Sequence, residues 1–226
     1  MTANLPESIK KLKEELAELP SIGPRQAIRL AFYLVSRGEN FIKNLSQDID
    51  ELRRVKICER CFFVHQNSPS TVLGASGSLC DICKNPARRK DVIMLVEKET
   101  DLISLENTGK FNGRYFILGP IPKTGLLEDS QKLRLQSLKN FIQKELGGPS
   151  TDSTGSPQAG SGQGKAEEII LALNPSSVGD FHASLLAKEL GEFTKKINRL
   201  GRGLPTGGEI EFADDETLGS ALEKRS

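Results

Sequence analysis

The four cysteines of the chain could together bind a metal ion. They form two Cys-x-x-Cys pairs separated by eighteen residues: Cys58, Cys61, Cys80 and Cys83. A gap of two residues lets both thiolates of a pair turn toward one ion, and two such pairs supply the four sulfur ligands of a tetrahedral Zn²⁺ site. Because four cysteines leave no coordination position open, we expect this zinc to be structural and not catalytic.

Other uses of the cysteines are less well supported. Two disulfides would require an oxidising compartment, but the first residues lack the basic and apolar regions of a secretory signal, so we predict a cytoplasmic protein. A thioredoxin-like redox pair needs one Cys-x-x-Cys at the start of a helix and leaves the second pair unexplained. His65 lies between the pairs and could replace a ligand, although a solvated loop histidine is the more common case.

A turn near the N-terminus has the features of a phosphate-binding site. Apolar residues recur at helical spacing on both sides of residues 20–24, which predicts two helices joined by a tight turn. Gly23 can adopt a positive φ there, and Pro24 suits a first helical turn. The unpaired N–H groups at a helix start can hold a phosphate oxygen without reading a base.

Two arginines would add positive charge beside that turn. Arg25 and Arg29 are one helical turn apart and therefore lie on the same helix face. An ordinary helical hairpin with solvated arginines fits the spacing equally well. A third helical pattern covers residues 41–52, and a basic cluster at residues 84–90 follows the second cysteine pair; such a cluster is usually a solvated face.

The composition describes a soluble chain of one or two domains. It has 226 residues, of which 37% are apolar and 27% charged, and no apolar run is long enough to span a membrane. Residues 1–90 carry 15 Lys and Arg against 10 Asp and Glu, whereas residues 91–226 carry 16 against 20. Any phosphate-binding surface is therefore expected in the first part.

The second part alternates between strand and helix patterns. Apolar runs at residues 92–96, 115–118 and 169–173 predict buried strands, with a fourth strand expected at 197–200. Helical patterns between them cover residues 100–107, 133–146 and 181–190. This alternation predicts a mostly parallel sheet covered on both sides. Residues 147–164, rich in Gly, Ser and Thr, have too few apolar side chains to order themselves and are interpreted as a disordered insertion.

Polar residues follow two of these strands. Glu97 and Asn174 stand at the carboxyl ends of the first and third strands, where sites of parallel sheets form, and Asp180 lies near the start of the next helix. A Mg²⁺-dependent phosphoryl-transfer site would need several converging carboxylates. These residues supply too few, so we predict that the protein is not an enzyme.

Taken in order, these segments resemble the bacterial recombination mediator family RecR. Residues 19–32 resemble its helix-hairpin-helix segment, residues 95–98 and 108–116 resemble the start of its Toprim domain, and residues 202–211 resemble the segment after that domain. The resemblance covers nearly the whole chain outside the insertion. It implies a multidomain α+β chain with four parts: a helix-hairpin-helix domain at 1–55, a four-cysteine zinc-finger module at 56–90, an α/β Toprim domain at 91–203 and a C-terminal segment at 204–226.

The resemblance also implies a function. The family consists of non-catalytic DNA-binding factors of recombinational repair, which act on the bacterial nucleoid. Its members assemble as ring-shaped tetramers built from dimers, and they work with RecO, and in many bacteria RecF, to load recombinase onto gapped DNA. Arg25 and Arg29 stand where the family has DNA-contacting basic residues. One departure is that Val178 replaces an acidic residue of the family pattern after the third strand.

Two alternatives to a DNA clamp remain open at this stage. A Toprim-type nuclease or topoisomerase would share Glu97, but its Asp-x-Asp pair is replaced here by residues 174–176. A strand-cleaving topoisomerase also needs a tyrosine nucleophile, and the only tyrosines, Tyr33 and Tyr115, are interpreted as packing residues. The other alternative is a protein adaptor that binds its partner through the zinc module.

Overall fold

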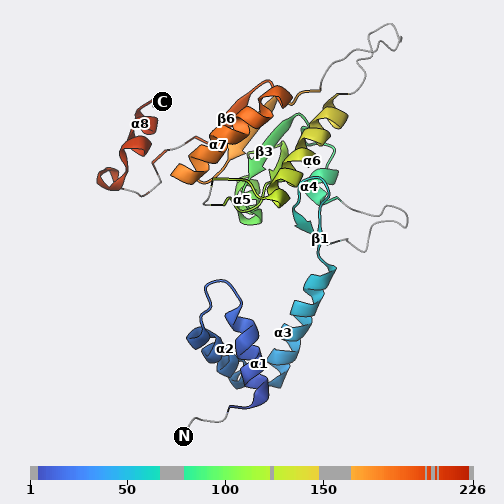
Figure 1. The fold of residues 1–226 in the computed structure, drawn as a ribbon, viewed down its shortest axis with the longest axis vertical. Coiled ribbons are helices and arrows are strands. Elements are labelled where there is room, and N and C mark those ends of the chain that lie inside the picture. The colour runs from blue at the N-terminus through green and yellow to red at the C-terminus, as the bar shows by residue number, and fades with distance from the viewer. Residues whose placement is uncertain are drawn as a thin grey trace. The chain divides into compact units, whose positions relative to one another are not determined.

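The computed structural model describes residues 5–66, 79–122, 125–147, 164–201, 203–204, 207 and 209–223. The chain divides into two compact units, residues 1–55 and 56–226 (Figure 1); the finer division into four parts stays a prediction. Most of the predicted insertion lies outside the described residues. Among the helices that are described, none has the length and apolar character needed to cross a bilayer.

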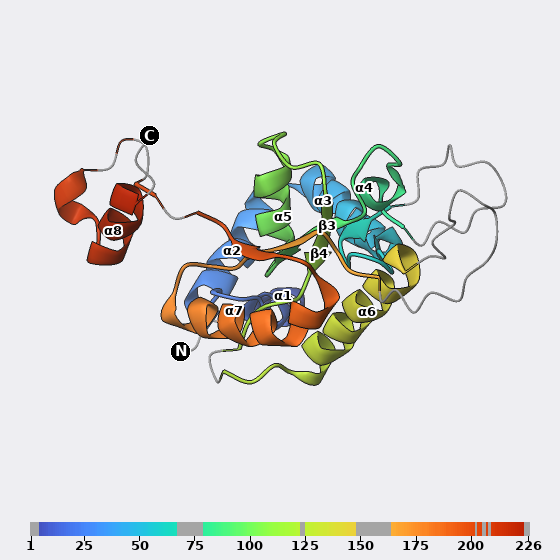
Figure 2. The ribbon, with the colours of Figure 1, turned by 90° about the horizontal axis from the view of Figure 1, so that it is seen from above.

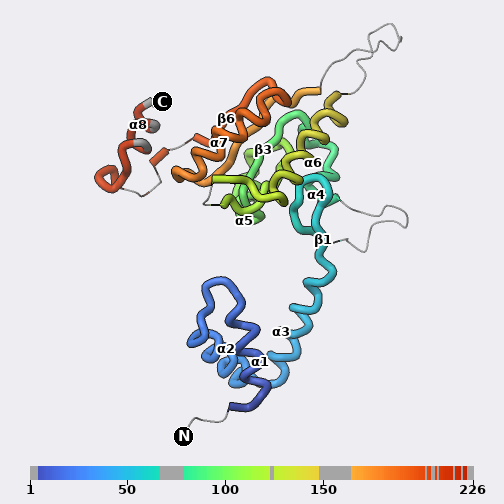
Figure 3. The backbone as a smooth tube through the Cα atoms, viewed as in Figure 1, coloured from blue at the N-terminus to red at the C-terminus, as the bar shows by residue number. Residues whose placement is uncertain are grey.

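Three helices and a short 3-10 turn form the first unit: α1 (Glu7–Ala17), α2 (Pro24–Ser36), α3 (Glu39–Glu51) and η1 (Leu52–Arg54). α1 and α2 pack side by side (Figure 3). Ala27 and Ala31 on α2 are fully buried, and their small side chains allow neighbouring helices to approach closely. Gly38, with φ of 84°, makes the turn into α3. All three helices agree with the sequence pattern.

The turn between α1 and α2 differs from the prediction in one respect. Gly23 has φ of −82° and ψ of 168°, an extended conformation that any residue can adopt. The positive φ falls instead on Ser21, at 65°. The chain therefore reverses two residues earlier than expected, and Pro24 opens α2 as predicted. A Cβ on Gly23 would meet no atom within 4 Å, so packing does not require glycine there.

A four-stranded parallel sheet forms the centre of the second unit. Its strands, in the spatial order β4-β3-β5-β6, are β3 (Val92–Val96), β4 (Arg114–Ile117), β5 (Glu168–Ala172) and β6 (Ile197–Arg199). Leu95 of β3 lies in register with Phe116 of β4 and Leu171 of β5. The predicted parallel sheet is confirmed, with each strand placed within one residue of its sequence pattern.

Helices cover both faces of this sheet (Figure 2). They are α5 (Glu99–Glu106), α6 (Asp129–Leu146) and α7 (Ser177–Leu190). Ile93 and Leu95 face the core formed with α6 and α7, whereas Met94 and Val96 face the side of α5. Because both faces are covered, every residue of β3 is buried.

Two large apolar residues of the helix patterns predicted in the second unit do not face the core. Leu133 on α6 is 70% exposed and Phe181 on α7 is 54% exposed. α6 also begins four residues earlier than its pattern, at Asp129. At about 3.6 residues per turn, Leu133 lies about half a turn from the buried Gln131 and Leu135, and Phe181 lies about half a turn from the buried Gly179 and Ala183, so both stand on the outer face of their helix.

The remaining elements surround the sheet. They are β1 (Lys56–Ile57), β2 (Val64–His65), α4 (Asp81–Lys84), η2 (Gly191–Phe193), η3 (Ile210–Phe212) and α8 (Asp215–Glu223). Gly147 after α6 and Gly164 before β5 lie beside each other, since a Cβ on Gly164 would come 2.1 Å from the Gly147 nitrogen. The end of α6 and the approach to β5 therefore meet at one point.

Candidate functional site

Two separate segments bring the four cysteines together. Cys58 and Cys61 lie in the turn between β1 and β2. Cys80 directly precedes α4, and Cys83 lies within this helix. In the first turn, the Cys58 N–H donates to the Phe63 carbonyl at 2.8 Å and the Phe62 N–H donates to the Cys58 carbonyl at 2.9 Å. Phe62 has φ of 64°, a left-handed conformation within this turn.

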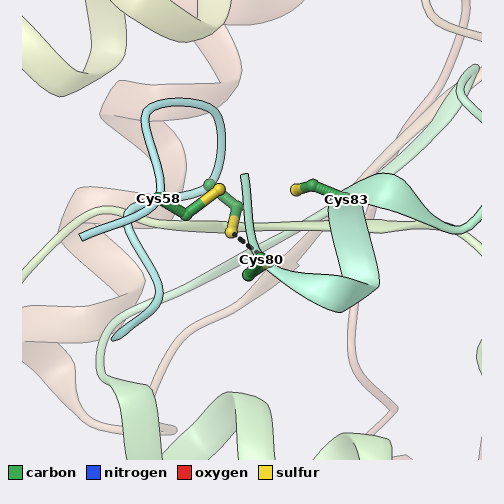
Figure 4. A group of neighbouring side chains, drawn as sticks. Cys58, Cys80 and Cys83 are labelled. Atoms are coloured by element: carbon green, nitrogen blue, oxygen red, sulfur yellow. Dashed lines mark hydrogen bonds between the residues drawn. The ribbon is translucent and has the colours of Figure 1, made fainter. Parts of the chain in front are cut away.

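The geometry of the cysteine cluster fits one tetrahedral ion. All four side chains are buried, and their sulfur atoms lie within 4.8 Å of one another. Figure 4 shows Cys58, Cys80 and Cys83 converging from the two segments, and the Cys61 and Cys80 sulfurs are 3.4 Å apart. Zn–S bonds of about 2.3 Å place tetrahedral sulfurs roughly 3.8 Å apart. No other group of three or more Cys, His, Asp or Glu side chains gathers in this way among the described residues.

The thiols affect one another's protonation. The side-chain hydrogen bond with Cys61 lowers the pKa of Cys58, and the same hydrogen bond raises the pKa of Cys61. Four buried thiols at this separation cannot all lose their protons unless a cation balances the charge. A metal ion held among the four sulfurs could supply that balance.

The cysteine module is attached to the edge of the sheet. The Ile117 N–H of the edge strand β4 donates to the Cys61 carbonyl at 2.9 Å. Phe62 packs edge-on against Phe116 with ring centroids 5.4 Å apart. From the second segment, the Cys83 carbonyl accepts hydrogen bonds from Arg114 at 2.7 Å and from Arg60 at 3.4 Å. Both halves of the module therefore contact the sheet or its flanking residues.

The histidine and the basic cluster near the cysteines have other roles. His65 lies in β2 outside the sulfur cluster, and its Nε2 atom is buried, so it is not the solvated histidine that we expected. Within the basic cluster, Arg88 pairs with Glu106, Arg89 pairs with Asp91 and Lys90 approaches Glu145 at 4.0 Å. The Arg88 side chain is therefore buried and paired within the chain, whereas the side chains of Arg89 and Lys90 are more than half exposed.

The start of α2 presents the groups that the sequence suggested for phosphate. Gly23, Arg25 and Arg29 are all exposed. The N–H groups of Gly23 and Arg25 make no hydrogen bond within the part of the chain that the structure describes, whereas those of Gln26 and Ala27 donate to the Gly23 carbonyl at 2.9 Å. Neither arginine has a carboxylate partner among the described residues. This end of the helix is thus positively charged and accessible.

At the carboxyl edge of the sheet, two of the three predicted polar residues meet. Glu97 is 8% exposed, and its Oε2 accepts a hydrogen bond from Asn174 Nδ2 at 2.7 Å. Its Oε1 accepts the Ile121 N–H at 3.2 Å, a contact that the sequence did not indicate because it comes from the backbone. A cavity of about 190 Å³ beside them is lined also by Val178.

The third predicted residue, Asp180, does not join the Glu97–Asn174 pair. Its carboxylate forms an ion pair with Arg199 at the end of β6, and it does not line the Glu97 cavity. The sequence did not single out Arg199, because the partner lies nineteen residues away and only the parallel order of β5 and β6 brings it close. The predicted set of Glu97, Asn174 and Asp180 is therefore brought together only in part.

Comparison with known proteins gives consistent results along the chain. Residues 9–53 match the family model described as RecR, helix-hairpin-helix, residues 91–201 match that of the Toprim domain, and residues 203–226 match RecR, C-terminal. A protein named "Recombination protein RecR" from Roseiflexus sp. is 35% identical over 98% of this chain and 94% of its own length. The chain belongs to the RecR family. Proteins of the same name from Chloroflexus aurantiacus and Gloeobacter violaceus are 36% and 32% identical, each over 96% of this chain and over 93% and 96% of their own lengths.

Membership of the RecR family supports a role in DNA recombination and repair. It also confirms the fold class expected from the sequence, with an N-terminal helix-hairpin-helix, a clustered set of four cysteines and a Toprim domain with a parallel sheet. Of the two tyrosines, Tyr115 is buried as expected, and burial raises its pKa. Tyr33 is 53% exposed, which contradicts its interpretation as a packing residue.

One glycine of this RecR-family chain controls the geometry of the Glu97–Asn174 pair. Gly179 lies in the first turn of α7, where the Ser176 Oγ accepts its N–H at 3.2 Å. A Cβ at this position would come 2.0 Å from the Asn174 carbonyl oxygen. The helix can therefore approach the loop after β5 only because no side chain stands between them.

We expect Gly179→Ala to destabilise the Toprim domain, because the methyl group must push α7 away from Asn174. Overpacking of this kind costs on the order of 1–3 kcal/mol, measurable by urea unfolding. Gly191→Ala is the matched control, since a Cβ there meets nothing within 4 Å and φ is −56°; it should be neutral or slightly stabilising. Equal stability of the two variants would contradict the close approach.

Proposed function

We propose that this protein is a DNA-binding recombination mediator with no chemistry of its own. In this proposal it is a zinc-stabilised, ring-type clamp that helps to load recombinase onto gapped DNA. Its protein partners would be RecO and possibly RecF, as the family resemblance implies, and its site of action would be the bacterial nucleoid. Family membership along nearly the full length supports this function.

The start of α2 carries the DNA-binding part of the proposal. Two free N–H groups, at Gly23 and Arg25, and the exposed guanidinium groups of Arg25 and Arg29 form a surface suited to phosphate oxygens. The absence of a side chain at Gly23 lets a phosphate reach the backbone, although packing does not require glycine there. None of these groups can distinguish bases, so binding should tolerate any sequence.

The four cysteines would hold Zn²⁺ as a structural ion. When bound, the ion neutralises part of the thiolate charge and joins the β1–β2 turn to α4, two segments that otherwise share little apolar core. Cys58 and Cys61 would hold it from one side, Cys80 and Cys83 from the other. The ion would thereby fix the module that contacts the edge strand β4 through the Cys61 carbonyl.

The Toprim sheet supports a binding role better than phosphoryl transfer. Both Glu97 oxygens already accept hydrogen bonds, from Asn174 and Ile121, and Asp180 pairs with Arg199. Glu97 is thus the one carboxylate that lines its cavity among the described residues. Two-metal phosphoryl transfer needs several carboxylates around the ions. We propose that Glu97, Asn174 and Asp180 shape a partner contact.

We therefore expect no cleavage of supercoiled or gapped DNA in the presence of Mg²⁺, and no difference between the wild-type protein and Glu97→Gln. Gel electrophoresis of the DNA after long incubation measures both. The glutamine keeps an acceptor for the Ile121 N–H but places an NH2 group beside Asn174 Nδ2, so a urea unfolding curve of the variant checks that it folds. Mg²⁺-dependent cleavage that disappears in Glu97→Gln would instead establish the Toprim-enzyme alternative.

A homo-oligomer, dimer or tetramer, completes the proposal. On α2 the large apolar side chains of Phe32, Tyr33 and Val35 are each about half exposed, and a contact with a second copy would bury them. Mass measurement with and without DNA tests the assembly.

A gel-shift on gapped and linear DNA at increasing salt tests the clamp. DNA retention that weakens steeply with salt supports it, whereas no retention in dilute buffer would favour the zinc-module adaptor.

A further inference from the structure

One buried arginine beside the cysteine module has no anionic partner among the described residues. Arg114, the first residue of β4, is only 4% exposed. Its Nη1 donates to the Cys83 carbonyl at 2.7 Å, and its Nε is buried without a hydrogen-bond partner. No carboxylate forms an ion pair with it in the part of the chain that the structure describes.

This situation differs from that of its neighbour Arg88. The Arg88 side chain is also buried, at 9% exposure, but it pairs with Glu106 and donates to the Gly113 carbonyl at 2.8 Å. A buried cation without a compensating charge strongly opposes folding, because it loses its hydration and gains nothing equivalent. In the part of the chain that the structure describes, the negative charge that compensates Arg114 must therefore come from a group other than a carboxylate.

With a metal ion bound, the cysteine cluster would carry a negative charge beside Arg114. Four thiolates around one divalent cation carry a net charge of −2. The carbonyl that Arg114 binds belongs to Cys83, one of the four ligands, and the second donor to the same carbonyl, Arg60, also approaches Glu145 at 3.5 Å. Arg114 is thus the buried positive charge that adjoins the cluster.

We propose that Arg114 is the positioning residue and charge partner of the metal centre. Its guanidinium group orients Cys83 through the carbonyl and offsets the negative charge of the tetrathiolate, so that metal affinity depends on it. The inference rests on the proposed binding of zinc by the four cysteines. Outer groups that orient metal ligands typically change metal affinity by about 10–100-fold when they are removed.

Zinc affinity of full-length variants, measured by competition with a chromophoric chelator, tests the proposal. We expect Arg114→Met, which removes charge and donor but keeps an apolar chain of similar length, to bind zinc at least about 10-fold more weakly than the wild type. Arg114→Lys keeps a charge and one donor and should recover most of that affinity. Arg88→Met is the matched control: it removes a similarly buried arginine that pairs with Glu106 and not with the cysteine carbonyls, and zinc affinity should stay within about 3-fold.

The possible outcomes separate the role of Arg114 from the existence of the metal centre. Wild-type affinity in Arg114→Met, a loss in Arg114→Lys as large as that in Arg114→Met, or an equal loss in Arg88→Met would overturn the role of Arg114. A wild-type protein that binds no zinc would overturn the metal centre itself. If Arg114→Met does not fold, Arg114→Gln decides, because glutamine keeps a side-chain donor at this position and removes the charge: several-fold weaker zinc binding supports the charge-partner role of Arg114, and unchanged binding opposes it.

Discussion

Cys80→Ser should lose its metal ion and release the cysteine module from the sheet. Structural zinc contributes on the order of 10 kcal/mol in small modules, and even part of that would lower the melting temperature by roughly 10 °C or more in a unit of this size. Among the described residues of the module, only Phe63, Leu79 and Ile82 pack against the cysteines, so we expect these contacts to be too few to replace the ion. Calorimetry combined with zinc analysis measures the effect.

Amide hydrogen exchange shows which part of the Cys80→Ser variant has lost stability. The Ile117 N–H donates to the Cys61 carbonyl and not to another strand, so its exchange should accelerate when the module loosens. Amides of the central strand β3 should stay protected, because β4 and β5 flank it on both sides. Asp81→Ser, an exposed substitution next to Cys80, is the control and should keep the ion. Unchanged melting and unchanged exchange at Ile117 in a metal-free preparation would contradict a structural zinc.

Replacing Arg25 and Arg29 with alanine should weaken DNA binding and its dependence on salt. Each phosphate contact contributes about 0.9 to the slope of log affinity against log salt, so two lost contacts lower the slope by about 1.8. At about 50 mM salt this corresponds to an affinity loss on the order of 10²-fold. Fluorescence anisotropy over a series of salt concentrations gives slope and affinity together.

A control variant with the same change in net charge separates direct phosphate contacts from the general electrostatic attraction of the protein to DNA. Arg53 and Arg54 lie in η1 of the same unit, and Arg53 already pairs with Asp50 at 3.0 Å. Their replacement with alanine should reduce affinity slightly and leave the slope nearly unchanged. If both double variants behave alike, or if Arg25→Ala/Arg29→Ala binds as the wild type does, the start of α2 is not the DNA site.

Local sequence patterns predicted the elements well because their physical causes are local. The continuous apolar run at 92–96 is satisfied by a strand buried on both faces, and the structure places it between two neighbours in the sheet. Pro24 opens α2 as expected, since its missing N–H costs nothing at a helix start. The helix predicted at residues 100–107 is followed by Gly109, whose φ of 64° is typical of a glycine that stops a helix.

Site details that depend on distant contacts were less predictable. The sequence placed Asp180 near Glu97, but its carboxylate pairs with Arg199 at the end of β6 instead. The positive φ expected at Gly23 lies at Ser21, two residues earlier in the same turn. Arg114 could have been noticed as a charged residue that opens an apolar strand, yet its partner, the Cys83 carbonyl, lies thirty-one residues earlier in the chain.

The sequence by itself determined the two closely spaced cysteine pairs, the alternation of strands and helices, and the two arginines at a helix start, because each follows from residue types at short spacing. Only the tertiary structure decided that the cysteine module binds the edge of β4, that Asn174 and Ile121 occupy both oxygens of Glu97, and that Arg114 lies buried beside Cys83. These contacts join residues that are far apart in the chain, and their geometry is fixed by the order and register of the strands.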